Sequence, residues 1–418
     1  MNVFLKNSNF RIFSLGSFFS TAGDILFYLA LITYASKLEN YSLAISLIGI
    51  TETAPHLFGT IGGYFADRSA NKLRSMVHLA LFRAGLYLIV GFLFCQNLPG
   101  WHLVLMVIVL NFFSDSLGIY SYGLQSPTIV ALVGEKQLGE AQGFNNGFNQ
   151  IITMLAQFVG SGLLLVMNYS LLAVVNAGTF LVAAALFAIT SRRTNLQKAK
   201  PVTSESTNIN RDSLGQTLKK VYRQTIHIPG LVPSILTLTL VNGILGTMDP
   251  LFAILVRNSE QQMLILNFSF TIACYTTALG LGVASGGILG TLLFKNIPVQ
   301  HFSWITALMV MGEFSMMLLR QVWLCLVFCV LVGFFAGIMG PKITKWITTS
   351  VERSILSSSM GTLNMLVTIS QPLGTAIFTT VATVGGLNTS ITSLIAISFL
   401  TALITSILAL KITTKSAN

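Results

Sequence analysis

The chain has 418 residues, of which 53% are hydrophobic and only 9% are charged. A soluble domain carries about 25% charged residues, so this composition excludes a soluble globular protein and predicts one that crosses a membrane many times. The formal net charge of +11 arises from short loops between apolar runs rather than from one basic face, so no nucleic-acid partner is expected. The four cysteines lie inside apolar runs without metal-type neighbours, and no metal site is expected.

Apolar runs of about 20 residues, the length that spans a bilayer as a helix, recur along the whole chain. The run at 262–293 is long enough to be tilted or to contain a break. Twelve helices are predicted, at 11–36, 42–66, 75–96, 101–124, 139–166, 170–190, 230–256, 262–293, 299–319, 322–348, 355–382 and 386–411.

The order of these runs predicts an all-α membrane protein built from two pseudo-symmetric bundles of six helices. Residues 1–190 form the first bundle and residues 229–418 the second. Residues 191–228 are polar and basic, and they predict a cytoplasmic linker with a short helix on the membrane surface. Basic residues gather in the loops on the side of this linker, which places both termini in the cytoplasm by the positive-inside rule.

A short loop between the second and third predicted helices carries most of the charge in the first hundred residues. Glycines there allow two helices to approach closely, and the charged side chains predict a hydrated clasp at the membrane face. The clasp residues are Gly63, Asp67, Arg68, Lys72 and Arg74.

The loop resembles the signature of the major facilitator superfamily, in which a glycine is followed by an aspartate, an arginine and further basic residues. Gly63, Asp67 and Arg68 match, whereas Ala70 replaces the next glycine. The opening Asn9-Phe10-Arg11 with Gly23-Asp24, and Gln125-Ser126-Pro127, are similar to the macrolide-efflux branch of the drug:proton antiporters. The resemblance implies the major facilitator fold and a monomeric transporter, not an enzyme, in the cytoplasmic membrane of a bacterium.

Acidic residues inside the predicted spans need a partner or a task, because an acid near the bilayer centre costs at least about 2.5 to 3.5 kcal/mol. We expect four of them to carry protons that enter outside and leave inside. The alternative for the first two is a hydrogen bond between helices or an ion pair with Arg83. Glu313 lies in the ninth predicted helix, for which a supporting role is expected. The four predicted proton carriers are Asp24, Glu52, Asp115 and Asp249.

Polar residues recur every three or four positions in several predicted helices, so each of these helices has one polar face. The faces of the first, fourth, fifth, seventh and eleventh helices predict a shared water-accessible cavity. The predicted substrate-binding residues are Thr21, Asp24, Tyr28, Asn111, Asp115, Tyr122, Asn146, Asn149, Thr153, Asn242 and Asn364.

The chain lacks a phosphate-binding Gly-x-x-x-x-Gly-Lys-Ser/Thr loop. The energy source is therefore expected to be a proton gradient, without a bound cofactor. The leading hypothesis is proton-coupled efflux of hydrophobic or amphipathic drugs, macrolide-like or multidrug, by alternating access. A second hypothesis is proton-coupled transport of an endogenous metabolite, peptide or nutrient, and a third is a non-transporting membrane receptor or scaffold.

Overall fold

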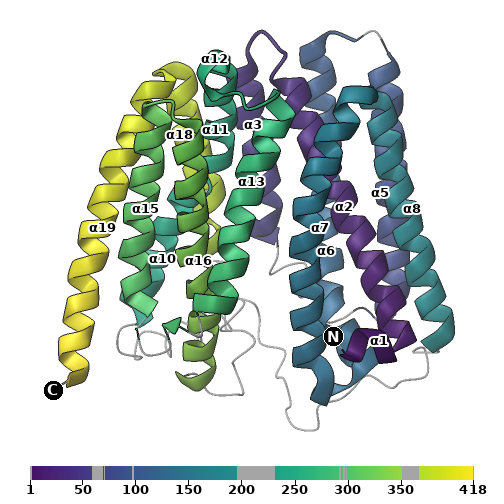
Figure 1. Ribbon diagram of the computed structural model, residues 1–418. Coiled ribbons are helices and arrows are strands. Elements are labelled where there is room, and N and C mark those ends of the chain that lie inside the picture. The colour runs from purple at the N-terminus through teal and green to yellow at the C-terminus, as the bar shows by residue number, and fades with distance from the viewer. Residues whose placement is uncertain are drawn as a thin grey trace. The chain divides into compact units, whose positions relative to one another are not determined.

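The computed structural model describes residues 2–58, 69, 71–96, 98–194, 231–290, 293–294, 297, 299–350 and 367–417. These residues are helical apart from turns and short connections, and no strand occurs among them. The chain divides into two compact units, and Figure 1 colours the helices of both by residue number. Unit 1 comprises Met1–Ala44 and Phe58–Thr203, and unit 2 comprises Ile45–Leu57 and Ser204–Asn418.

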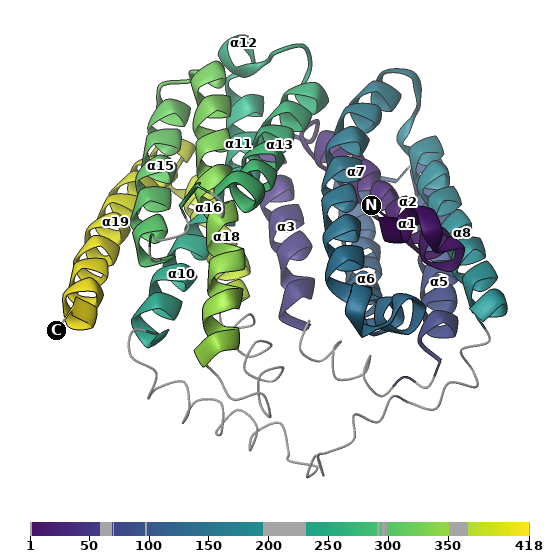
Figure 2. The same cartoon turned by 60° about the horizontal axis from the view of Figure 1, so that its bottom comes forward.

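Unit 1 is a bundle of long helices. The first long helix begins where the side chain of Asn7 accepts a hydrogen bond from the backbone N–H of Phe10 at 3.0 Å, which satisfies a donor that the helix leaves free. A short helix, α1 (Asn2–Lys6), lies across the end of this bundle in Figures 1 and 2. The other helices are α2 (Ser8–Ala35), α5 (Lys72–Cys95), α6 (Gly100–Val133), η2 (Glu135–Gln137), α7 (Leu138–Val166) and α8 (Tyr169–Thr194).

Unit 2 contains helices that are interrupted more often. The helix α3 (Tyr41–Thr53) tightens into the 3₁₀ turn η1 (Ala54–Phe58), and most of α3 groups with this unit. The remaining elements are α10 (Leu231–Leu245), α11 (Met248–Asn258), α12 (Glu260–Met263), α13 (Phe268–Ser285), the π-helical segment η4 (Gly286–Gly290), α15 (Val299–Leu318), α16 (Val322–Ser350), α18 (Ser370–Val384) and α19 (Leu387–Ala417).

The assignment of α3 differs from the sequence-based division, which places residues 1–190 in one bundle. Contacts group Ile45–Leu57 with unit 2. The physical reason is a close approach at Gly49, where a Cβ atom would lie 3.0 Å from Pro250 and 3.3 Å from the methyl group of Thr375. The predicted linker lies outside the described residues from position 195 onward.

Nine helices in the described part of the chain are long and apolar enough to cross a membrane. Two other predicted spans, 42–66 and 355–382, are described only in part, and the span predicted at 299–319 coincides with α15. The fourth helix is longer than predicted, because α6 continues through Pro127 to Val133. The all-helical membrane fold expected from the hydropathy pattern is thus confirmed.

Two predicted spans are broken. A turn at Gly246 and Thr247 separates α10 from α11, and Pro250 lies in the first turn of α11, where its missing N–H has no helical acceptor. The span predicted at 262–293 begins instead at Phe268, where Asn267 caps α13.

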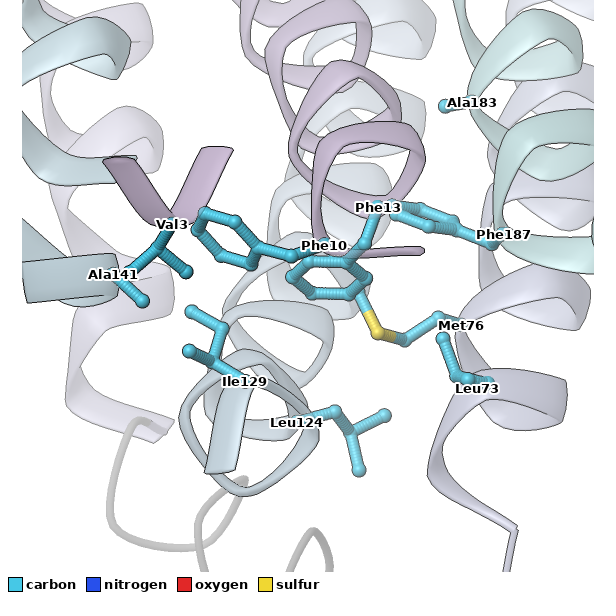
Figure 3. Close-up of a cluster of buried hydrophobic side chains, with 10 residues drawn as sticks. All are labelled: Val3, Phe10, Phe13, Leu73, Met76, Leu124, Ile129, Ala141, Ala183 and Phe187. Carbon is cyan, nitrogen blue, oxygen red and sulfur yellow. The ribbon is translucent and has the colours of Figure 1, made fainter. Parts of the chain in front are cut away.

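Aromatic packing holds one end of unit 1 together. Phe10 and Phe13 of α2 are fully buried, and the ring of Phe13 lies 5.7 Å from that of Phe187 in α8. Met76 of α5 and Leu124 of α6 belong to the same cluster, whose side chains are drawn together in Figure 3. Four helices therefore share one apolar core at this end.

Glycines bring α13 and η4 against α16 in unit 2. A Cβ atom at Gly333 would lie 2.9 Å from the backbone nitrogen of Val283, and one at Gly337 would lie 2.9 Å from its Cα. These distances are too short for a side chain, so the two helices touch through their backbones. We call the set Gly282, Gly286, Gly333 and Gly337 the glycine seam.

Candidate functional site

Arg83 lies in the middle of α5, and only 3% of its side chain is exposed. A buried guanidinium requires both charge and hydrogen-bond partners. Its Nη2 forms an ion pair with the carboxylate of Asp24 from α2, and its Nε donates to the hydroxyl of Ser114 from α6 at 2.9 Å. The ring of Phe180 from α8 lies 4.2 Å from Cζ, a cation–π contact. Four helices therefore contribute to the surroundings of one cation.

A chain of hydrogen bonds orients the second acid. The hydroxyl of Tyr87 donates to Oδ1 of Asn111 at 2.7 Å, and Nδ2 of Asn111 donates to Oδ2 of Asp115 at 2.7 Å. The other oxygen of Asp115 lies 3.9 Å from Nη2 of Arg83. We call Arg83, Asp24, Asp115, Asn111 and Tyr87 the Arg83 centre.

Helical spacing explains why these side chains meet. Arg83 and Tyr87 are four residues apart on α5, so they share one face. On α6, Asn111 and Asp115 are likewise four apart, and Gly118 follows on the same face. A Cβ atom at Gly118 would lie 3.2 Å from Nη1 of Arg83, so the glycine makes room for the guanidinium.

The centre has an imbalance of charge and of access. Two carboxylates share one guanidinium, which leaves one negative charge when both acids are ionised. Arg83 is 3% exposed, whereas Asp24 is 33% and Asp115 is 18% exposed. An ionised carboxylate in the middle of a membrane helix is not stable against acyl chains. The exposed part of Asp24 therefore faces water or a polar ligand.

Polar contacts extend from Asp24 toward α7. One turn earlier on α2, Thr21 donates to Oδ1 of Asn149 at 3.1 Å. Gln157, two turns further along α7, is buried, and its Oε1 accepts no hydrogen bond. Apolar surface accompanies these amides, since the ring of Phe148 stacks with that of Phe18 at 5.7 Å. Polar and aromatic groups thus alternate between α2 and α7.

Other predicted substrate-binding residues of unit 1 lie outside the Arg83 centre. Tyr122 is 62% exposed, and Asn146 is also exposed. Tyr28, one turn beyond Asp24, and Thr153 on α7 are half-buried. Their predicted contact with substrate stays a prediction.

Most of the predicted clasp lies outside the described residues. Gly63, Asp67 and Arg68 lie outside the described residues. Lys72 is half-buried at the start of α5 and donates to the carbonyl oxygen of Ser69 at 3.2 Å, whereas Arg74 is exposed. The described end of the loop therefore holds its lysine against the backbone.

The polar residues of α10 and α18 in unit 2 bond to each other. Nε2 of Gln371 donates to Oδ1 of Asn242 at 3.0 Å, and Nδ2 of Asn242 donates to the carbonyl oxygen of Val367 at 2.9 Å. The predicted partner residue Asn364 lies outside the described part of the chain. Asn242 thus links two helices of its own unit.

The remaining predicted proton carriers differ in their surroundings. Asp249 is half-buried in the first turn of α11, and its buried Oδ1 accepts no hydrogen bond. Glu52 is half-buried near the end of α3, and His56 is exposed in η1. The role of Glu52 as a proton carrier stays a prediction.

Sequence reasoning missed several residues that form or contact the Arg83 centre. Tyr87 and Ser114 take part directly, and Ser20 lies one turn before Asp24 with its hydroxyl 3.4 Å from Nη1 of Arg83. The available signal was the pair of Arg83 and Tyr87 at four-residue spacing in an otherwise apolar helix. Among the described residues, no group of three or more His, Cys, Asp or Glu side chains could hold a metal ion.

Comparison with known proteins places these features in context. A family model described as Major Facilitator Superfamily matches residues 13–298. No curated protein matches the chain in sequence.

Solved structures of similar fold are numerous and distant in sequence. A mutant of the peptide transporter POT, in complex with alafosfalin, superposes with a TM-score of 0.75 at 12% identity, covering 97% of this chain and 95% of that one. A bacterial homolog of the human lysosomal transporter Spinster, inward-facing and unoccupied, has a TM-score of 0.67 at 12% identity, with 98% of each chain covered. A mutant of the nucleoside transporter NupG has a TM-score of 0.62 at 13% identity, covering 96% of this chain and 100% of that one. At these identities the likeness shows the fold alone.

Proposed function

Because the chain belongs to the Major Facilitator Superfamily, and is thus a secondary transporter that spans a membrane several times, we propose that it exports amphipathic organic molecules in exchange for protons. Alternating access moves the cargo, and the Arg83 centre is where proton and cargo compete. The expected energy source is the proton gradient, with no cofactor. The preferred cargo carries a positive charge beside an apolar body.

The observation that carries this proposal is the unequal access to the Arg83–Asp24 ion pair. The guanidinium is sealed between helices, whereas one third of Asp24 is exposed in the middle of α2. A ligand can therefore reach the acid without removing the cation from its site. A purely structural ion pair would be expected to bury both partners.

The charge balance of the centre supports an exchange mechanism. With both acids ionised the centre carries one net negative charge, and either one proton or one cationic group neutralises it. The two ligands therefore exclude each other at Asp24. Such mutual exclusion is what an antiporter needs, because its carrier must return loaded with the opposite ligand.

Aromatic surface beside the polar contacts fits an amphipathic cargo. The rings of Phe144 and Phe148 stack at 4.4 Å, and Phe148 is 38% exposed. Phe18 of α2 adds a third ring next to Thr21. The apolar part of a cargo held at Asp24 would lie against this surface.

A second candidate is proton-coupled transport of a polar metabolite such as a peptide or a nucleoside. The amides of α7 favour it, because Asn149 and the unpartnered oxygen of Gln157 offer hydrogen bonds that a hydrophobic drug does not use. The solved structures of similar fold include peptide and nucleoside transporters, which is in keeping with this alternative.

The two candidates differ in a transport assay with purified protein in inverted vesicles under an imposed pH gradient. We expect accumulation of ethidium, an amphipathic cation, and its loss in Asp24→Asn. The control is Glu39→Gln, an exposed acid in the turn after α2, which should transport as the wild type does. Accumulation of a dipeptide or uridine instead of ethidium would favour the second candidate. Undiminished ethidium transport by Asp24→Asn would refute the role of this acid.

A further inference from the structure

A second buried acid lies in unit 2, away from the Arg83 centre. Glu313 of α15 has no exposed surface, although the sequence assigned it only a supporting role. One of its oxygens, Oε1, accepts a hydrogen bond from the hydroxyl of Tyr275 on α13. The ring of Tyr275 stacks on that of Phe252 of α11 at 3.8 Å, which fixes the direction of the hydroxyl. Three helices thus position a single carboxyl group.

Asp249 lies three residues before Phe252 on α11, so it shares the face of this helix that stacks on Tyr275. Each of the two acids has a buried oxygen that accepts no hydrogen bond, namely Oε2 of Glu313 and Oδ1 of Asp249. We call Glu313 and Asp249 the unit 2 carboxyl pair. Both oxygens are therefore buried acceptors without a donor among the described residues.

The other groups that face the pair carry no positive charge. Cys325 and Cys329 of α16 are fully buried beside it, and the thiol of Cys329 lies 3.5 Å from the carbonyl oxygen of Tyr275. The helices α10 and α18 contain no titratable side chain, and α19 contains none between Leu387 and Ala409. In the described part of the chain, no basic side chain contacts either acid, since Arg257 pairs with Glu260 and Arg320 donates to Asn388.

Two carboxylates without a cation cannot both stay ionised in an environment of low dielectric constant. We propose that Glu313 and Asp249 form a proton-binding site that holds one exchangeable proton, with Tyr275 as the positioning donor. Asp249 is half-buried and is the entry side, whereas Glu313 is sealed. The proton moves between a carboxylate oxygen and water at Asp249, so no other reactant is needed.

This inference rests on the proposed function only for what the proton does, and not for its binding. A proton at the unit 2 carboxyl pair removes the repulsion between the two acids. Its release restores that repulsion and favours a conformation in which the acids move apart or gain water. The site therefore gives the transporter a second place, besides Asp24, where the pH on one side can alter the energy of a conformation.

Infrared spectroscopy of the purified protein in nanodiscs tests the site without cargo or gradient. The wild type should show a protonated-carboxyl stretch that disappears as the pH rises. Glu313→Gln should lose the part of this band that belongs to the unit 2 carboxyl pair and keep any part from Asp24, whereas the exposed-acid control Glu39→Gln should leave the band unchanged. Tyr275→Phe preserves ring stacking but removes the donor to ionised Glu313, so the midpoint should move to higher pH by about one to two units.

Four results would overturn the site. These results are the absence of the band, a band that does not change with pH, a band that is unaltered in Glu313→Gln, and a midpoint that shifts when sodium replaces choline. The last result would indicate a cation site. If Glu313→Gln fails to fold, the Tyr275→Phe midpoint alone decides, and an unmoved midpoint rejects the proposal.

The vesicle assay separates the two proposals. Loss of proton-driven ethidium transport in Asp24→Asn, together with an unresponsive infrared band, would reject only the unit 2 site. A titrating band in a protein whose transport ignores the pH gradient would reject only the proposed function.

Discussion

Unit 1 and unit 2 each carry two acids within their helices, and the surroundings of the two pairs differ. In unit 1, Asp24 and Asp115 share the guanidinium of Arg83. This guanidinium also donates a hydrogen bond to the hydroxyl of Ser114 and lies over the ring of Phe180. In unit 2, Glu313 and Asp249 have a tyrosine hydroxyl and no cation among the described residues. One cation shared by two acids leaves a single negative charge in unit 1, whereas in unit 2 no cation among the described residues balances either acid.

The helices within each of the two units also pack in different ways. Side chains fill the space between the helices of unit 1, as the stacked rings of Tyr87 and Phe180 illustrate at 5.5 Å. Backbones meet directly along the glycine seam of unit 2. Changes to charge are therefore expected to affect unit 1 most, and changes to side-chain volume to affect unit 2 most.

The largest effect is expected from removing the cation of unit 1. Arg83→Met leaves Asp24 and Asp115 without their shared partner and should destabilise the protein by about 3 to 5 kcal/mol, measured as a lower thermal unfolding midpoint in detergent. The triple variant with Asp24→Asn and Asp115→Asn should recover much of this loss. If Arg83→Met alone unfolds as the wild type does, the cation does not hold the bundle together.

The next effect should appear at the glycine seam. Gly337→Val places methyl groups against the backbone of Val283, where even a Cβ atom would lie 2.9 Å from Cα, and should lower stability by about 1 to 3 kcal/mol. Gly340→Ala is the matched control on the same helix, because no atom lies within 4 Å of its Cβ position. Equal unfolding midpoints for the two variants would contradict direct backbone packing.

A smaller change should follow Tyr87→Phe. The variant keeps the ring between Phe27 and Phe180 but leaves the buried Oδ1 of Asn111 without its donor, so we expect a loss of about 1 to 2 kcal/mol. Unfolding in Asn111→Ala and in the double variant completes a cycle. An interaction energy near zero would show that the hydroxyl does not stabilise the Asp115 chain.

The smallest loss of stability is expected when the asparagine that caps a helix is replaced, a change that can be made at equivalent positions in the two units. Asn7 accepts from Phe10 N–H at the start of α2, and Asn267 accepts from Phe270 N–H at the start of α13. Alanine at either position should lower stability by about 1 kcal/mol. Asn7→Ala should be the larger loss, because Asn7 also donates to the carbonyl oxygen of Leu132 at 2.9 Å. The reverse order of unfolding midpoints would contradict this comparison.

The sequence was most informative about the helices and about which of them carry polar faces. Hydropathy places the spans because the bilayer requires apolar runs of fixed length. It misses interruptions inside a run, such as the turn at Gly246, because a single glycine does not change the apolar character of the run. Spacing brought Thr21 and Asp24 to one face. Spacing on single helices could not show that Arg83 joins both acids, because that depends on how three helices pack.

For the same reason the sequence undervalued Glu313. A lone acid in a helix expected at the periphery indicates support. Its meaning changes only when Tyr275, distant in the chain, is found to donate to it and to stack on the helix that carries Asp249. Predictions for Asn146 and Tyr122 were drawn from the same periodicity, but those side chains lie outside the Arg83 centre.

The glycine seam has a mechanical consequence. Since carbonyl groups and Cα atoms touch along it, neither α13 nor α16 can rotate about its own axis without collision. The two helices are therefore expected to move as one rigid unit. Tyr275 belongs to α13 and Cys329 to α16. A displacement of the Tyr275 hydroxyl that moves α13 would therefore move α16 with it.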